Sequence, residues 1–145
     1  MKKIGISLLL FLAVILFQCK DEKKTESQDL AVQYPNKDSE LALLMREMYT
    51  DTETLKKAIE NKTLPPDFRE KFKKIHSAIP TDPKVKTESF AQLSNNFLNN
   101  LDQLYTSSNR VEGLETLIGS CIACHQNFCP GPIKRIKKLS TKTAN

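Results

Sequence analysis

The sequence predicts an all-α fold, an antiparallel four-helix bundle. Apolar residues recur three or four positions apart over long stretches, which is the spacing of one helix face. No stretch alternates apolar and polar residues as a half-buried strand would, and the chain contains only four glycines. Four amphipathic stretches joined by short connections pack most simply as an antiparallel bundle, whose core commonly holds a cofactor.

The first helix is expected to begin after Ser39 and to end near Asn61. Ser39 suits the cap position because its hydroxyl can accept a hydrogen bond from a free amide of the first turn. The apolar stripe that follows consists of Leu41, Met45, Met48, Leu55 and Ile59. A stripe of this width buries one face of the helix and leaves the other in solvent.

Prolines separate the second and third helices from the rest. The second is expected over about residues 68–79, because apolar residues step by three and four there until Pro80. The third is expected to open near Asp82 or at Thr87. The two stripes are Phe68, Phe72, Ile75 and Ile79, and then Phe90, Leu93, Phe97, Leu101 and Leu104.

The fourth helix is expected to begin near Asn109. Its stripe consists of Val111, Leu114, Ile118, Cys121, His125 and Phe128. It should end against Pro130-Gly131-Pro132, because proline lacks the amide that continues a helix and clashes with the preceding turn. The fourth helix therefore carries the chain's most informative residues.

Those residues read Cys121-Ile122-Ala123-Cys124-His125. Two thiols at this spacing with a histidine directly after the second are the attachment signature of c-type haem. Each sulfur forms a thioether with one vinyl group of the porphyrin, and the histidine becomes the proximal iron ligand. On a helix the three side chains share one face. We therefore expect one covalent haem c, held by Cys121 and Cys124 and ligated by His125.

Three other uses of these thiols fit less well. A thiol–disulfide redox pair normally follows a strand in a βαβ unit, and no strand pattern precedes this one. A zinc site of Cys121, Cys124, His125 and Cys129 would need adjacent residues to close around one tetrahedral ion. A disulfide within one helical turn is sterically poor.

Cys129 is the one thiol left after two thioethers and the lipidation described below. Its alternatives are a buried residue at the helix end, an intermolecular disulfide partner or a redox-active thiol. We expect burial.

Residues 1–18 are expected to be a signal peptide, with two lysines and then an apolar run. At about 14 residues this run is shorter than the roughly 20 that a membrane-spanning helix needs. Leu16 stands three positions before Cys19, which resembles the bacterial lipoprotein box, although Phe17 and Gln18 depart from its small residues. Cys19 is therefore the expected lipidation site, and ordinary signal cleavage is the alternative.

Residues 19–37 are charged and polar without a sustained period, so we expect a flexible, lipid-anchored tether ahead of a bundle domain of residues 38–140. The expected location is the bacterial cell envelope, as an exported periplasmic or outer-surface lipoprotein. That agrees with the motif, because c-type haem is attached outside the cytoplasm. The formal net charge of +5 includes two lysines of the signal segment, so the remaining charge is too small for general nucleic-acid affinity.

The haem motif on the last of four helices, followed within one turn by Phe128, resembles the cytochrome c-prime family and its low-spin relatives. The stretch Met48–Ile59 also resembles the first helix of the b-type four-helix-bundle cytochrome. In the c-prime family the first helix supplies the distal position, with a methionine in six-coordinate members and an apolar residue in five-coordinate, gas-binding ones. The resemblance implies Met48 as distal ligand and Met45 as the alternative. The family's Arg-Gln pair before this position is absent.

Two functions follow from the distal position. With His125 and a methionine bound, iron has no open site, which suits single-electron transfer with redox partner proteins at the membrane or in the periplasm. Without the methionine, the open site suits NO or CO. Neither version has an acid/base pair, so no enzyme is expected. His76 is a poor second candidate ligand, because another haem would need another motif, and a homodimer stays open since related bundles often dimerise.

The residues after the fourth helix form a short amphipathic segment. Three apolar residues, Ile133, Ile136 and Leu139, alternate with four basic ones, Lys134, Arg135, Lys137 and Lys138. We expect the apolar side to cap the bundle and the basic side to face solvent. The alternative function of the basic side is docking of an acidic redox partner or of anionic lipid headgroups.

Overall fold

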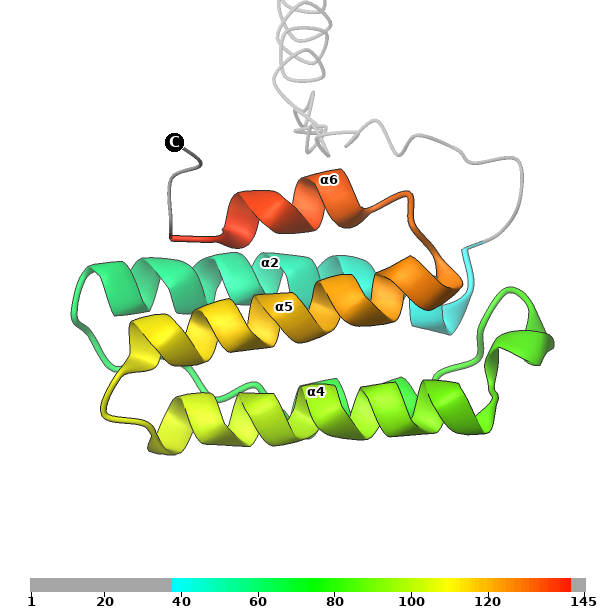
Figure 1. Ribbon diagram of the computed structural model, residues 1–145, viewed down its shortest axis with the longest axis horizontal. Helices are drawn as coiled ribbons and strands as arrows, with labels where there is room; N and C mark the ends of the chain where they lie inside the picture. Colours follow the sequence, from blue (N-terminus) through cyan, green and yellow to red (C-terminus); the bar gives the residue numbers. More distant parts are fainter. Residues whose placement is uncertain (1–37, 142–145) are drawn as a thin grey trace, which may run out of the picture. The chain divides into compact units, whose positions relative to one another are not determined.

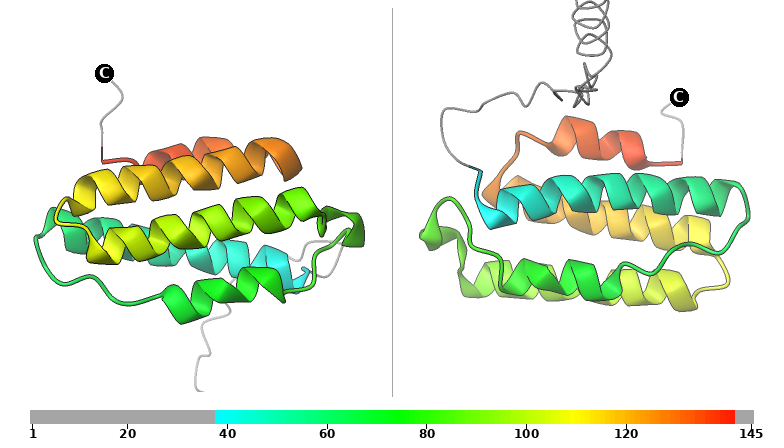
Figure 2. Two further views of the ribbon diagram at one scale, coloured as in Figure 1. Left: turned by 60° about the horizontal axis from the view of Figure 1, so that its bottom comes forward. Right: turned by 180° about the vertical axis from the view of Figure 1, so that it is seen from behind.

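The computed structural model describes residues 38–141, and this part of the chain is all α, with no strand among those residues. The predictions for residues 1–18 and 19–37, including Cys19, lie outside the described residues. Within residues 38–141, no helix combines the length and apolarity that crossing a bilayer requires. Helices α3 (Arg69–Phe72) and α4 (Glu88–Thr106) pack antiparallel, which confirms the predicted class at the level of a helical bundle. Figure 1 labels α4, and the views of Figure 2 show α3 beside it.

The long helices are α2 (Glu40–Glu60), α4 and α5 (Arg110–Phe128). They begin with side-chain caps from Ser39, Thr87 and Asn109, and each cap accepts a hydrogen bond from the amide three positions later. These bonds satisfy amides that have no partner within the helix. The predicted starts at Ser39 and Asn109 are confirmed, and the third helix begins at Thr87 rather than at the earlier alternative.

The predicted second helix is wrong in its length. Helix α3 continues only as the 3-10 helix η2 (Lys73–His76), and Ile79 is exposed. The cause is a cap from outside the segment, because Lys86 Nζ donates to the last two carbonyls of η2 at 2.9 and 3.1 Å. Carbonyls at a helix end need such partners. The 3-10 helix η3 (Pro83–Val85), just before Lys86, leads into α4.

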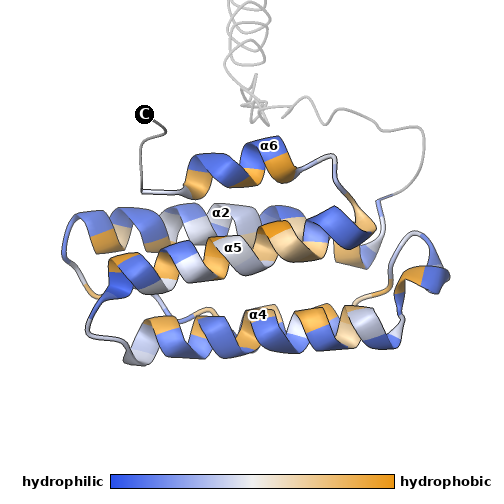
Figure 3. Cartoon of the chain, in the orientation of Figure 1, coloured by the Kyte–Doolittle hydropathy of each residue, from blue (hydrophilic) through white to orange (hydrophobic). Residues whose placement is uncertain are grey.

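The C-terminal segment comprises α6 (Ile133–Ile136) and the 3-10 helix η4 (Lys137–Leu139). It lies along α2 and α5, on the other side of these helices from α3 and η2 (Figures 1 and 2). Polar and apolar residues alternate along it (Figure 3). Ile136 and Leu139 are buried, so the apolar side packs on the long helices as expected.

The core is filled from the long helices and from α3. Its fully buried side chains include Leu55, Phe72, Leu101, Leu104, Leu114 and Leu117. The Phe72 ring stacks between Phe68 and Phe97, with centroids 5.9 Å from each. Although α3 is short, it therefore supplies a central side chain of the core.

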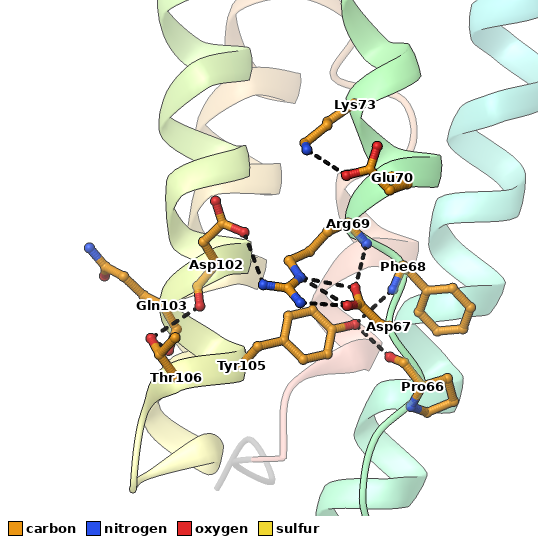
Figure 4. Close-up of polar contacts among 10 residues, drawn as sticks. All are labelled: Pro66, Asp67, Phe68, Arg69, Glu70, Lys73, Asp102, Gln103, Tyr105 and Thr106. Carbon is orange, nitrogen blue, oxygen red and sulfur yellow. Dashed lines mark hydrogen bonds and ion pairs between the residues drawn. The ribbon is translucent and has the colours of Figure 1, made fainter.

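Tyr105 of α4 holds the loop before α3 in place. Its hydroxyl accepts a hydrogen bond from the Phe68 amide at 3.0 Å and donates one to the Pro66 carbonyl at 2.5 Å (Figure 4). The Arg69 guanidinium lies 5.0 Å from the centroid of the Tyr105 ring. Arg69 also pairs with Asp67, and hydrogen bonds from it lower the pKa of that carboxyl to about 2. These contacts attach α3 to α4.

Helices α4 and α5 share the most extensive contact in the described chain, and Gly113 lies within it. A Cβ at this position would be only 3.1 Å from the Leu104 Cα. We expect Gly113→Ala to lower the free energy of unfolding by about 1–3 kcal/mol, because backbone atoms cannot move aside without shifting a helix. Urea denaturation measures the change.

Gly119→Ala is the matched control on the same helix. Nothing lies within 4 Å of the Cβ it would add, so the higher helix propensity of alanine should raise stability, by up to about 1 kcal/mol. Equal effects of the two substitutions would contradict a close approach at Gly113.

Candidate cofactor site

A cavity of about 680 Å³ lies between α2, the end of α5 and the C-terminal segment. This volume is within the range of cavities that hold small molecules and cofactors. Its apolar lining includes Leu41, Met45, Val85, Phe90, Phe128 and Ile136. The Phe90 and Phe128 rings meet edge to face, with centroids 5.5 Å apart. The cavity therefore suits a large, mainly apolar group.

Two residues of the Cys121–His125 motif, Cys124 and His125, line this cavity. The His125 Nδ1 lies 2.9 Å from the carbonyl oxygen of Cys129, one turn later. Because a carbonyl can only accept, Nδ1 is the nitrogen that carries the hydrogen in this contact, and in the neutral ring Nε2 is then the nitrogen with the lone pair that a metal ion needs. Such a bond also fixes the ring orientation, as is usual for metal-binding histidines.

Cys121 lines a smaller cavity of about 40 Å³ together with Met45, Met48 and His125. His125 and Met45 line both cavities, so the two cavities are neighbours. Both motif cysteines are free of disulfides, and burial raises the pKa of the Cys121 thiol to about 12 and that of Cys124 above its ordinary value. Protonated thiols are weak nucleophiles, which disfavours thiol–disulfide exchange.

The zinc alternative has no support in the geometry. Across residues 38–141, no three side chains of His, Cys, Asp or Glu are close enough to hold one metal ion. The expectation that Cys129 is buried is wrong, because this residue is exposed. It follows the last residue of α5 with an extended backbone (φ −157°), which takes it out of the helical stripe.

The two methionines differ in their surroundings. Met48 is 6% exposed, belongs to the core and lines only the smaller cavity. Met45 is partly buried and lines both cavities, as His125 does. The structure thus brings both candidate ligands near the motif, with Met45 facing the larger space. His76 is exposed on η2 and lines neither cavity.

Two arginines line the large cavity, and neither was singled out from the sequence as part of a site. Arg46 donates two hydrogen bonds to Asp38, at 2.6 and 2.7 Å, and holds the pKa of that carboxyl below its ordinary value. The Arg135 guanidinium lies 4.1 Å from the centroid of the Tyr49 ring. The sequence offered one indication that Arg46 belongs to the site, namely its position directly after the candidate ligand Met45.

Comparison with known proteins found no matching family model, no matching curated protein and no matching solved structure. The interpretation of the site therefore depends on its own residues. These fit a c-type haem in three respects: two thiols on one helix face, an imidazole whose Nδ1 is bonded to a carbonyl, and a large apolar cavity lined by Cys124 and His125. Arg135 adds positive charge at the cavity, whereas the charge of Arg46 is already paired with Asp38.

Proposed function

We propose that this protein is an extracytoplasmic, membrane-tethered monohaem cytochrome c that transfers single electrons. The observation that carries the proposal is His125, whose Nδ1 is held by the Cys129 carbonyl beside a cavity of about 680 Å³. When bound, the haem supplies the one-electron change between ferric and ferrous iron. The proposal includes an antiparallel four-helix bundle over residues 38–140, haem attachment on α5 and a lipid anchor at Cys19.

Each residue of the motif has a separate task in this proposal. The Cys121 and Cys124 thiols would hold the group by adding across its two vinyl groups, each S–H giving one C–S and one C–H bond. His125 Nε2 would bind the iron, and the Cys129 carbonyl keeps the imidazole in one orientation. The apolar walls of the cavity would exclude water.

Met45 is the better placed distal ligand, because it lines both cavities together with His125. Met48 is the alternative, although it lines only the smaller of the two cavities. A thioether from either methionine would leave the iron no site for small ligands and would favour its ferrous state, which suits electron transfer. This combination also agrees with the resemblance to low-spin relatives of cytochrome c-prime.

A haem stain after denaturing electrophoresis tests the proposal, because covalent haem stays with the chain. The full chain should stain when expressed in a host that attaches c-type haem. The double variant Cys121→Ser/Cys124→Ser should lose the stain, and Cys129→Ser is the matched control that should keep it. An unstained wild type would contradict the proposal.

Optical spectra of the stained protein separate electron transfer from gas binding. Electron transfer predicts low-spin iron in both oxidation states and no ready reaction of the reduced protein with CO. A high-spin spectrum with rapid CO binding would instead support the five-coordinate, gas-binding alternative. In that case neither methionine occupies the sixth position.

A further inference from the structure

We propose that the exposed side of the C-terminal segment is a docking surface for an acidic redox partner protein. This surface, called the basic ridge, consists of Lys134, Arg135, Lys137 and Lys138. The inference rests on the proposed electron-transfer function and adds the chemistry and location of the partner. The partner is a one-electron donor or acceptor whose docking face carries carboxylates.

The charge of the basic ridge is not compensated locally. All four side chains are exposed, and Arg135 contacts the Tyr49 ring. Within the part of the chain that the structure describes, no carboxylate pairs with the three lysines of the ridge. Lys71, by contrast, lies 3.0 and 2.8 Å from two carboxylates. The ridge therefore presents a concentrated positive charge to solvent.

The basic ridge is also held rigidly. Its inner residues Ile136 and Leu139 are only 7% and 3% exposed. At its end, the Glu115 carboxylate accepts hydrogen bonds from the Thr141 amide and hydroxyl at 2.6 and 2.7 Å. Lys56 Nζ donates to two carbonyls near the end of η4 at 3.3 and 2.9 Å. A surface ordered before binding loses little conformational entropy on docking.

The basic ridge lies directly over the candidate haem site. Arg135 lines the large cavity, Leu139 lines the smaller one, and Ile136 lines both. Figure 1 shows this segment running along α2 and α5, the helices that carry the candidate iron ligands. Because electron-transfer rates fall steeply with distance, a partner docked on the ridge would be favourably placed.

The same packing favours a protein partner over a lipid surface. An amphipathic segment binds a membrane by burying its apolar face at the boundary of headgroups and acyl chains. In this segment Ile136 and Leu139 already belong to the core, so that face is occupied. Charge without an apolar insertion is typical of electrostatically steered, short-lived contacts between proteins.

The test compares two charge reversals in the haem-loaded full chain. Lys137→Glu/Lys138→Glu changes two adjacent exposed lysines on η4. Lys73→Glu/Lys74→Glu makes the same change on η2, which Figure 2 shows on the other side of the helices. Far-ultraviolet circular dichroism checks that both variants are folded.

Stopped-flow mixing of the reduced protein with hexacyanoferrate(III) measures the effect, with this anion as the probe for an acidic partner. One electron leaves ferrous iron and produces hexacyanoferrate(II). We expect the ridge variant to react about fivefold more slowly than wild type at low ionic strength, and the control within about twofold. The difference should disappear at about 1 M salt, where charges are screened. With tris(phenanthroline)cobalt(III), a cation, the ridge variant should be the faster one.

Equal slowing of both variants would overturn the proposal, because net charge alone would then explain the rates. A ridge variant that reacts like wild type but loses a preference of the wild type for phosphatidylglycerol over phosphatidylcholine vesicles would identify a lipid-binding surface instead. A wild type without haem stain overturns the proposed function as well. If the wild type stains for haem but the ridge variant reacts with hexacyanoferrate(III) as fast as the wild type, only the proposed docking surface is overturned.

Discussion

Met45→Ala is expected to abolish the red-region absorption band that methionine gives to ferric haem and to leave the iron high-spin. The expectation follows from the position of Met45, which lines both cavities together with His125. Because a thioether stabilises ferrous iron, the reduction potential should fall by on the order of 100 mV, within the roughly 0.8 V that axial ligands span. Optical spectra and a redox titration of the haem-loaded protein measure both changes.

Met48→Ala is the matched control, since it makes the same change one helical turn away. Met48 is 6% exposed, so its loss should cost about 2–4 kcal/mol of stability while the band persists. If Met48→Ala removes the band and Met45→Ala retains it, Met48 is the ligand and our preference is wrong. A wild type without the band would exclude methionine ligation altogether.

Phe72→Ala is expected to cause the largest loss of stability among single substitutions in α3. The side chain is fully buried, and its ring lies 5.9 Å from the centroids of Phe68 and Phe97. Removing a buried aromatic ring costs about 3–5 kcal/mol, a large share of the roughly 5–15 kcal/mol that stabilises a domain. Urea denaturation followed by circular dichroism measures the loss.

Phe68→Ala provides the comparison for this prediction. Phe68 is partly buried and stacks on Phe72 alone among the rings described, so it should lose about half as much free energy. Equal losses, or a greater loss at Phe68, would contradict a central position of Phe72. The haem stain of both variants shows whether the cofactor site survives.

The parts of the fold that depend on neighbouring residues could be predicted from the sequence. The starts of α2 and α5 follow from Ser39 and Asn109, whose side chains bond amides only three positions away. The end of the second helix could not be predicted in this way. It depends on Lys86, which reaches back about ten positions to cap η2, and hydrophobic periodicity contains no information on that contact.

The candidate site also has a part that could be predicted from the sequence and a part that could not. Cys121, Cys124 and His125 lie on one face because of the helical repeat, which the sequence predicts. The surroundings of Met45 and the exposure of Cys129 depend on how α2 and the chain after α5 pack, so local patterns could not settle them. Arg46 was missed because only the packing of α2 against the other elements shows that this residue lines the cavity.

Within the described domain, the helix contact at Gly113 and the helix contacts around the cavity differ in how closely the helices pack. Helices α4 and α5 approach closely at Gly113, where an added Cβ would lie 3.1 Å from the Leu104 Cα. The cavity lies where the end of α5 meets α2 and the C-terminal segment, with Phe90 of α4 also in its wall. If haem binds as proposed, we expect the hairpin of α4 and α5 to be assembled already in the protein without haem, and the residues of α2 and the C-terminal segment that line the cavity to rearrange around the porphyrin.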